Sequence, residues 1–241
     1  MDTFNQSAWA KEEFSRNYLE RADIYIPGRR KMIGTMSSLF AYFFGDKKGP
    51  RVLDLGCGDG VLTEELLTID STIMATLVDG SPAMLKKARE RIKVPQEMHF
   101  VHASFQDILA GRTSLGNYDL CISSHSIHHL AGEEKAALFT YIAGHLNSGG
   151  RFINIDVVLP PSAELEGWYF TIWKEWMQQM MDQLNMKDEL PEDIIRRYKD
   201  PSSMNKPDTL EFQLEALKGA GLSDVDCYYK NGIFAVFGGK K

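Results

Sequence analysis

The sequence predicts an α/β fold in which a doubly wound, mostly parallel sheet carries helices on both faces. Short apolar runs alternate with amphipathic stretches, which is the pattern that successive βαβ units produce. A glycine-rich segment, RVLDLGCGDGV from Arg51 to Val61, joins the first apolar run to a helical pattern. Near the C-terminus Asn231-Gly232 separates two apolar runs, so the sheet is expected to close with an antiparallel hairpin.

The expected elements follow in order along the chain. Strands are expected at five apolar runs followed by two closing ones: Val52–Leu55, Ile73–Asp79, His99–Ala103, Tyr118–Ser123, Arg151–Val158, Val225–Tyr229 and Ile233–Phe237. Amphipathic spacing predicts helices between the first five: Leu62–Ile69, Pro82–Ile92 and Glu133–Leu146. The last of these helices is expected to stop at the turn Asn147-Ser148-Gly149-Gly150.

Two regions fall outside this core and are expected to form a helical cap. Residues 1–45 carry helical patterns around Ala8–Arg21 and Arg29–Phe44, and residues 160–207 form an insertion rich in large side chains. The core would then comprise residues 46–159 together with residues 208–241, which end in the hairpin. Aromatic and methionine residues of the insertion repeat at three and four positions. This stripe either packs against the core or a second copy in a homodimer, or lines a substrate pocket.

Composition narrows the class of protein. A chain of 241 residues with 44% hydrophobic and 25% charged residues is typical of a globular protein with one sizeable core. Its formal net charge of −6 does not favour a groove for a phosphate backbone, so no nucleic-acid partner is expected. The three cysteines, Cys57, Cys121 and Cys227, fit free thiols in a reducing compartment. No apolar run approaches the about 20 residues of a membrane helix, so we expect a cytoplasmic protein without a membrane partner.

The glycine-rich segment is a candidate ligand loop. Asp54, Gly56, Gly58 and Gly60 suit a sharp turn, because glycine accepts positive φ and lets a ligand approach the backbone closely. The loop leads into the amide-rich N-terminus of a helix. Alone, it could serve a dinucleotide, a phosphate or a nucleoside, and its spacing differs from G-x-G-x-x-G.

The carboxyl ends of the next strands carry further candidates, since ligands bind at that edge of a parallel sheet. Asp79 lies about 20 residues after the loop, where a carboxylate can accept hydrogen bonds from ribose hydroxyls. It could instead be an exposed turn residue. Ser81-Pro82 then begins a helix and leaves Met84 on its first turn, either against a base or in the core. After the third strand, Ser104 and Phe105 offer a hydroxyl and an aromatic ring for a base.

At this point the chain resembles the class I S-adenosylmethionine methyltransferases. The resemblance is carried by VLDLGCGDG, LVDGSPAML, YDLCISSHSIHHL and NSGGRFINID, over roughly residues 50–158, and by the closing strands. It implies a Rossmann-like sheet of seven strands in the order 3-2-1-4-5-7-6, with the last strand antiparallel, and S-adenosylmethionine as cofactor. The resemblance implies Asp54 and the backbone of Gly56, Cys57 and Gly58 at the methionine part, Asp79 at the ribose, Ser104 and Phe105 at the adenine, and the Ser123 carbonyl at the amino group. Gly80, Ser81 and Met84 are counted with the candidate cofactor residues, Met84 as the one that would meet the adenine.

The cap resembles a subgroup that acts on small molecules. YIPGRRKMI, the aromatic insertion and the ending FAVFGGKK are similar to bacterial and archaeal small-molecule methyltransferases, and the cap layout is similar to that of the carboxy-S-adenosylmethionine synthases. In those enzymes a cap arginine holds the added carboxylate of the cofactor, and Arg197 lies near the matching place, with Arg196 as competitor. An acceptor that bears a carboxylate is therefore considered. Tyr18, Tyr25, Trp168 and Trp173 are possible walls of the acceptor site.

Three histidines follow the fourth strand. His125 and His128 are candidate bases, since histidine needs little tuning for proton transfer near neutral pH, whereas His129 is expected to be structural. The spacing H-x-x-H-H also resembles the metal-binding E-x-x-E-H of ubiquinone-type O-methyltransferases, so a site for zinc or a similar metal at His125, His128 and His129 is a minor alternative. Three hypotheses remain: a small-molecule methyltransferase, an enzyme that makes a carboxylated sulfonium, and a non-catalytic cofactor-binding protein.

Overall fold

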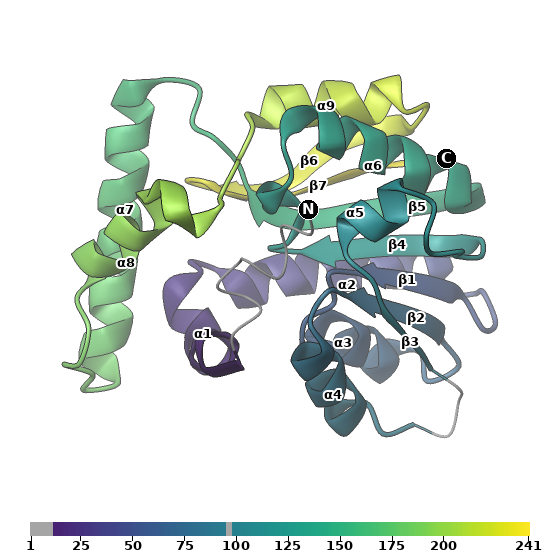
Figure 1. Ribbon diagram of the computed structural model, residues 1–241, viewed down its shortest axis with the longest axis horizontal. Helices are drawn as coiled ribbons and strands as arrows, with labels where there is room; N and C mark the ends of the chain where they lie inside the picture. The colour runs from purple at the N-terminus through teal and green to yellow at the C-terminus, as the bar shows by residue number, and fades with distance from the viewer. Residues whose placement is uncertain (1–11, 95–97) are drawn as a thin grey trace.

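The computed structural model describes residues 12–94 and 98–241, with side chains from residue 19 onward. Its centre is one seven-stranded sheet in the order β3-β2-β1-β4-β5-β7-β6, which confirms the predicted fold (Figure 1). The strands are β1 Arg51–Leu55, β2 Met74–Asp79, β3 His99–His102, β4 Tyr118–Ser124, β5 Leu146–Val157, β6 Ser223–Asn231 and β7 Phe234–Lys240. The first five pair in parallel, and β7 runs antiparallel to both β5 and β6.

Helices cover both faces of the sheet, and the strands bury a side chain on each face in alternation. One face packs against α2 Arg29–Phe44, α3 Val61–Ile69 and α4 Pro82–Arg91, and the other against α5 Phe105–Leu109, α6 Gly132–His145 and α9 Leu210–Gly219. In β1, Val52 joins the first apolar cluster, whereas Leu53 and Leu55 join the second. The strands of a sheet that is covered on both faces have nearly continuous apolar sequences, and these strands fit that pattern.

The cap consists of α1 Glu12–Tyr25, α7 Ala163–Gln183, α8 Pro191–Lys199 and the short η4 Pro201–Ser203. In Figure 1, α7 and α8 stand side by side beyond the end of the sheet, with α1 between them and the core. Indole nitrogens fasten the two parts of the cap to each other: Trp173 Nε1 donates to Tyr25 O at 2.7 Å and Trp176 Nε1 to Ile24 O at 3.1 Å. Part of the aromatic stripe therefore packs against the N-terminal helices.

Some local predictions differ from the structure. The segment Asn147–Gly150, expected to be a turn, belongs to β5, because Leu146 already pairs with Tyr118 and Gly149 N donates to Lys241 O at 3.2 Å. The helix α9 was not predicted, although Thr209 caps it by accepting from Phe212 N at 3.2 Å. The expected helix start at Ala8 lies outside the described residues.

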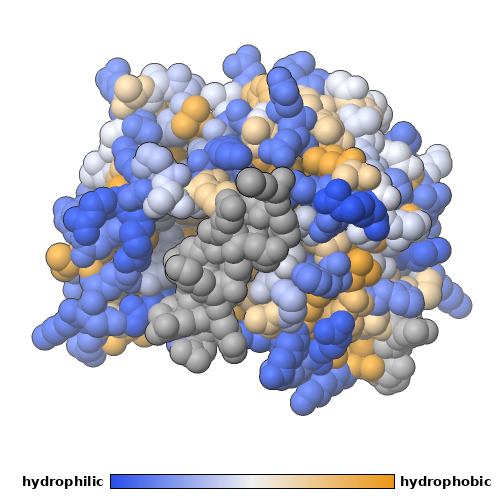
Figure 2. All heavy atoms as spheres, in the orientation of Figure 1, coloured by the Kyte–Doolittle hydropathy of each residue, from blue (hydrophilic) through white to orange (hydrophobic). Residues whose placement is uncertain are grey.

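Hydrophilic side chains cover most of the face seen in Figure 2 outside the grey residues. Within the described residues, no helix combines the length and the apolar character that crossing a bilayer requires. The three cysteines are free thiols.

The close contact of β5 and β7 gives a stability prediction. A Cβ added at Gly238 would overlap the backbone carbonyl of Phe152, so Gly238→Ala should lower the free energy of unfolding by about 1–3 kcal/mol. Gly167→Ala in α7 is the control, because an added Cβ meets nothing within 4 Å and alanine favours a helix by about 0.5–1 kcal/mol. Urea unfolding of both variants measures the difference, and equal stabilities would contradict the packing argument.

Candidate functional site

Two neighbouring cavities open at the carboxyl ends of the strands. The glycine-loop cavity lies over β1, β2 and β4 and is lined by residues that include Asp54, Gly58, Asp79 and Ser104. The cap cavity lies under α1, α7 and α8 and is lined by residues that include Tyr25, His128, Trp173, Tyr198 and Phe234. Ile26 and His125 line both cavities and therefore stand at their junction.

The glycine loop keeps its shape through backbone contacts and a close side-chain approach. Gly56 N and Cys57 N both donate to Val78 O, at 2.8 and 3.0 Å, which ties the loop to the end of β2. Gly56 has φ 66°, and a Cβ there would overlap the Ser126 side chain. Gly58 has φ 54° and faces open space, since an added Cβ would meet nothing within 4 Å. The backbone at Gly58 is therefore open to close approach by a ligand.

Asp79 connects the glycine loop to the following loop. One carboxylate oxygen accepts from Gly58 N at 2.8 Å, and the other accepts from Ser81 N at 2.7 Å. Burial raises the pKa of this carboxyl, although the two backbone N–H groups oppose the shift. Ser81 caps α4 by accepting from Met84 N at 3.4 Å, and Met84 is buried in the cavity wall.

Asp54 presents an unsatisfied oxygen at the same cavity. Thr63 Oγ1 donates to its Oδ2 at 2.7 Å, whereas Oδ1 is buried without a hydrogen-bond partner among the described residues. Burial raises the pKa of Asp54 to about 7 despite the bond from Thr63, and the charges of Asp79 and Asp59 add to the effect. A buried polar atom without a partner requires an explanation, and here the cavity supplies one: a cationic ligand group would satisfy Oδ1.

The third strand end differs in detail from the prediction. Ser104 caps α5, and its N–H and hydroxyl both donate to Asp107 Oδ2, at 2.9 and 2.7 Å, so its side chain is already engaged in the cap. The hydrogen bond from the Ser104 hydroxyl is the largest of the effects that lower the pKa of Asp107 to about 2. Phe105 flanks the glycine loop, with Cζ 3.4 Å from the place of a Gly56 Cβ. Ser123 is fully buried with its hydroxyl on Leu55 O at 2.7 Å, and its neighbour Ser124 lines the cavity instead.

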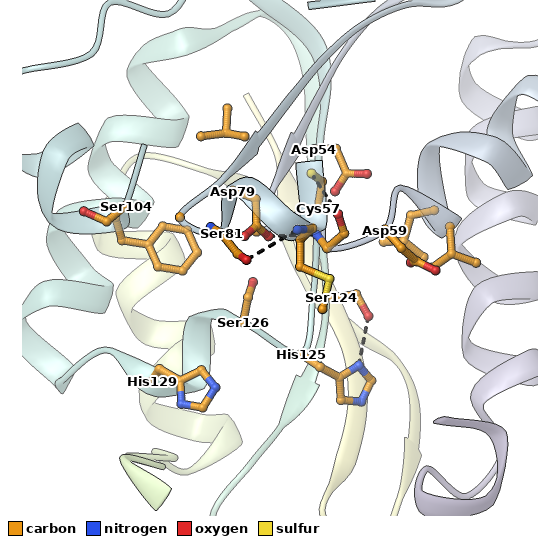
Figure 3. Close-up of a pocket in the computed structure, with 18 of the residues that line it drawn as sticks. Asp54, Cys57, Asp59, Asp79, Ser81, Ser104, Ser124, His125, Ser126 and His129 are labelled. Atoms are coloured by element: carbon orange, nitrogen blue, oxygen red, sulfur yellow. Dashed lines mark hydrogen bonds between the residues drawn. The ribbon is translucent and has the colours of Figure 1, made fainter. Parts of the chain in front are cut away.

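His125 holds an unusual backbone conformation at the junction. Its φ is 49°, in the left-handed region that residues other than glycine seldom adopt, and its N–H donates to Ile155 O at 2.8 Å. Nδ1 lies 2.9 Å from Ser124 Oγ, while Nε2 is buried with no partner in the described part of the chain (Figure 3). Burial lowers the pKa of His125 to about 4, so the ring is neutral at pH 7. The expectation of an imidazole that titrates near neutrality does not hold for this residue.

His128 forms a buried pair with Asp156. Its Nδ1 lies 2.6 Å from Asp156 Oδ1, and its backbone N–H donates to Oδ2 at 3.0 Å. Burial alone would raise the pKa of Asp156, but the charge of His128 and the hydrogen bond to it outweigh burial and lower this pKa. The side chain of His128 lines the cap cavity, and Nδ1 is the ring nitrogen already engaged. Asp156 was missed, although an acidic residue at a strand end was a usable signal.

His129 lines the glycine-loop cavity. Its Nδ1 lies 3.4 Å from Met204 O, and its ring centroid is 4.1 Å from that of His128. Burial lowers its pKa to about 3. Within residues 12–94 and 98–241, no three His, Cys, Asp or Glu side chains are grouped to hold a metal ion, so the geometry gives no support to the three-histidine metal site.

The predicted cap residues divide into two groups. Tyr25, Trp173 and Arg197 line the cap cavity. Trp168 is 57% exposed and lines neither cavity, and the side chain of Tyr18 lies outside the described part of the chain. Sequence reasoning overlooked Arg29, which lines the glycine-loop cavity and pairs with Asp23 at 2.8 Å, although it stands in the YIPGRRKMI segment.

A fully buried lysine fixes the histidine loop. Lys135 Nζ donates to Leu130 O at 2.7 Å, to Asp208 Oδ2 at 2.6 Å and to Lys206 O. Lys206 N in turn donates to His128 O at 2.8 Å. Lys135 therefore joins the loop that carries the histidines to the segment that follows η4.

Removing the Lys135 ammonium group should destabilise the folded protein. Lys135→Met leaves a carboxylate and two carbonyls without their donor, so the free energy of unfolding should fall by about 3–5 kcal/mol. The control is Lys218→Met, whose exposed i,i+3 pair with Glu215 at 2.7 Å should contribute less than about 1 kcal/mol. Chemical denaturation of both variants gives the two values. If Lys135→Met lowers the free energy of unfolding no more than Lys218→Met does, Lys135 does not hold the histidine loop as argued.

Comparison with known proteins agrees with this geometry. Residues 52–150 match a family model described as a methyltransferase domain. A carboxy-S-adenosyl-L-methionine synthase of Nautilia profundicola is 19% identical over 94% of this chain and 91% of its own length. A malonyl-[acyl-carrier protein] O-methyltransferase of Ilyobacter polytropus is 23% identical over 58% of this chain, and the match spans only 50% of that relative.

Solved structures share the fold at low identity. An O-methyltransferase family protein from Burkholderia thailandensis superposes with a TM-score of 0.68 at 15% identity, covering 98% of this chain and 62% of that one. Human N-acetylserotonin methyltransferase in complex with S-adenosylmethionine gives 0.60 at 17% identity, over 97% of this chain and 57% of the other. The stretch from β1 into β5 therefore matches a methyltransferase domain, and the chain shares its fold with solved methyltransferases.

Proposed function

We propose that this protein transfers a methyl group from S-adenosylmethionine to a small acceptor held in the cap cavity. The observation that carries the proposal is the meeting of two different cavities at Ile26 and His125. One has the glycine loop and acidic strand ends that suit a nucleoside with an ammonium group. The other has aromatic walls and the His128–Asp156 pair. Cofactor and acceptor would therefore face each other across the junction.

The residues of the glycine-loop cavity fit the cofactor group by group. Asp54 Oδ1 would accept from the ammonium group, and Arg29, which lines the same cavity, would pair with the carboxylate. Asp79 keeps lone pairs for the ribose hydroxyls after accepting its two N–H groups. Phe105 and Met84 offer apolar faces to the adenine. These assignments use Arg29 in addition to the residues predicted from sequence.

The chain's own part in the reaction is alignment, exclusion of water and proton transfer. The cofactor supplies a methyl group on a sulfonium, which makes the carbon electrophilic. His128 Nε2 would take the proton of the acceptor, while Asp156 holds the ring through Nδ1 and stabilises the imidazolium that forms. His125, neutral at the junction, would orient the acceptor through Nε2 rather than take its proton, because its pKa is about 4.

A second candidate is an enzyme that makes a carboxylated sulfonium from the same cofactor. It is favoured by the similarity to a carboxy-S-adenosyl-L-methionine synthase over 94% of this chain, and by Arg197 in the cap cavity. Arg197 is, however, already paired with Glu189, so a carboxylate on the cofactor or on the acceptor would have to compete with that side chain. Mass analysis of incubations with S-adenosylmethionine, with and without prephenate, separates this activity from methyl transfer.

The cellular setting is also part of the proposal. Free thiols at three cysteines fit a reducing, cytoplasmic compartment, and the net charge of −6 fits a small-molecule substrate better than a nucleic acid. A homodimer remains a prediction that sedimentation would test.

Cofactor affinity should depend on the ionisation of Asp54. Because its pKa is raised to about 7, the side chain is mostly neutral below pH 7 and must lose a proton to meet an ammonium group. Affinity for S-adenosylmethionine should therefore rise about tenfold per pH unit up to pH 7 and then level off, with Asp59 and Asp79 as the acidic neighbours. Isothermal titration calorimetry between pH 5.5 and 8.5 measures this slope.

The matched variant is Asp54→Asn, which keeps the shape but not the charge. It should bind about 10- to 100-fold more weakly at pH 8 and lose the slope. Since folding favours the protonated form of Asp54, stability is lost as pH rises from about 4 to 7, so the variant should be at least as stable as the parent at pH 8. Unchanged affinity in a folded variant would refute the assignment.

The His128–Asp156 pair gives an independent prediction. Asp156→Asn should lower kcat by about 10²- to 10⁴-fold, because the amide no longer fixes the ring or stabilises the imidazolium. The dissociation constant of the cofactor should stay within about threefold, since Asp156 does not line the glycine-loop cavity. Single-turnover kinetics with a bound acceptor separates the two effects, and a kcat near that of the parent would exclude His128 as the base.

A further inference from the structure

We propose that the acceptor is a neutral, planar aromatic molecule that presents a phenol-type hydroxyl. This inference rests on the proposed methyl transfer and narrows its substrate class. Three features of the cap cavity carry it: the geometry of the aromatic walls, the pairing of the charged rim, and the base that remains.

The walls of the cap cavity are rings held in fixed orientations. Trp173 makes edge-to-face contacts with Tyr198 and Phe234, both at a centroid distance of 5.4 Å. The indole N–H of Trp173 donates to Tyr25 O at 2.7 Å, which fixes its rotation. Ile194 and Val157 complete the apolar lining. Rigid, flat walls favour a flat apolar ligand, which gains stacking or edge contacts that a puckered ring does not make.

The arginines on the rim of the cavity are already paired with carboxylates. Glu189 accepts from Tyr25 OH at 2.6 Å, lies 3.5 Å from Arg21 and also pairs with Arg197. Arg21 pairs in addition with Asp188 at 2.5 Å. Both arginines of the lining are paired, so a carboxylate ligand would have to displace Glu189, and a cationic ligand would have to displace an arginine from Asp188 or Glu189. Asp200, the remaining carboxylate of the lining, is exposed and accepts from Ser202 N at 2.7 Å, so it offers a cation only a weak, solvent-screened partner. A ligand without charge makes neither demand.

The base defines the reacting group. Nδ1 of His128 is held by Asp156, which leaves Nε2 to take a proton from a ligand in the cavity. An imidazole takes a proton much more readily from a phenol, with a pKa of about 10 as in tyrosine, than from an aliphatic alcohol, whose hydroxyl resembles water at about 15.7. The oxygen forms a bond to the methyl carbon as the carbon–sulfur bond breaks and its electron pair stays on sulfur. The hydroxyl proton passes to His128 Nε2 and then to solvent.

A matched set of probes separates shape from charge. Calorimetry measures binding of 2-naphthol, decahydro-2-naphthol, 2-naphthoate and 2-naphthylamine to the protein saturated with S-adenosylhomocysteine. Mass spectrometry then measures methylation with S-adenosylmethionine. We expect 2-naphthol to bind at least about tenfold more tightly than its saturated analogue and the naphthoate, and to gain one methyl group on oxygen. Preferred binding or methylation of the naphthoate, the amine or the saturated alcohol would overturn the proposal, as would no binding of 2-naphthol.

Variants test the wall and the base separately. Trp173→Leu should weaken 2-naphthol binding about tenfold, whereas Trp168→Leu, an exposed tryptophan on the same helix, should leave it unchanged. His128→Gln should abolish turnover of 2-naphthol while 2-naphthol and S-adenosylhomocysteine still bind. Equal binding effects of the two tryptophan variants would refute the assignment of Trp173, and turnover of 2-naphthol by His128→Gln at the parental rate would refute the assignment of His128.

Cofactor binding distinguishes an error in the acceptor class from an error in the proposed methyl transfer. S-adenosylhomocysteine affinity is measured for every variant and reports both folding and the cofactor site. If the cofactor binds and the naphthol arms fail, the acceptor class is wrong while the cofactor site stands. If the parent protein does not bind the cofactor at all, the proposed methyl transfer itself is wrong.

Discussion

The Asp79 carboxylate is the contact on which the site depends. By accepting from Gly58 N and Ser81 N it holds two loops, from two neighbouring strands, at one edge of the sheet. The cost of burying this charge appears in its raised pKa, and the two N–H groups offset part of that cost. With both loops fixed, the missing Cβ atoms of the glycines become usable space, and the unsatisfied Asp54 oxygen faces a cavity of defined shape.

The loop beside the cap cavity is held by a second set of buried polar contacts. Asp156 positions His128 through both its ring and its backbone, and Lys135 attaches the same loop to the segment after η4. Both groups are almost completely buried, so each contact forms in a medium of low dielectric where it is strong and where its loss is costly. The histidines are thereby held at the end of the sheet, whereas Tyr25, Trp173 and Tyr198 of the cavity wall come from the cap and Phe234 comes from β7.

In the proposed function the sheet and its loops hold the cofactor, and the groups added around them select the acceptor. In this chain the added groups are rings in edge-to-face contact and charges that neutralise one another. The similar proteins include a carboxy-S-adenosyl-L-methionine synthase and a malonyl-[acyl-carrier protein] O-methyltransferase, which is consistent with a variable cap.

The sequence by itself determined the sheet, its strand order through a family resemblance, and the positions of Asp54 and Asp79, because apolar periodicity and glycine placement are local properties. It could not distinguish Trp173 from Trp168, five residues apart on one helix, since only packing against Tyr25 decides which ring is buried. Nor could it predict the fall in the pKa of His125 to about 4 or the partnership of His128 with Asp156. Burial and contacts between distant segments arise only when the chain has folded, so the tertiary structure alone decided that His128, and not His125, forms a hydrogen bond with a carboxylate.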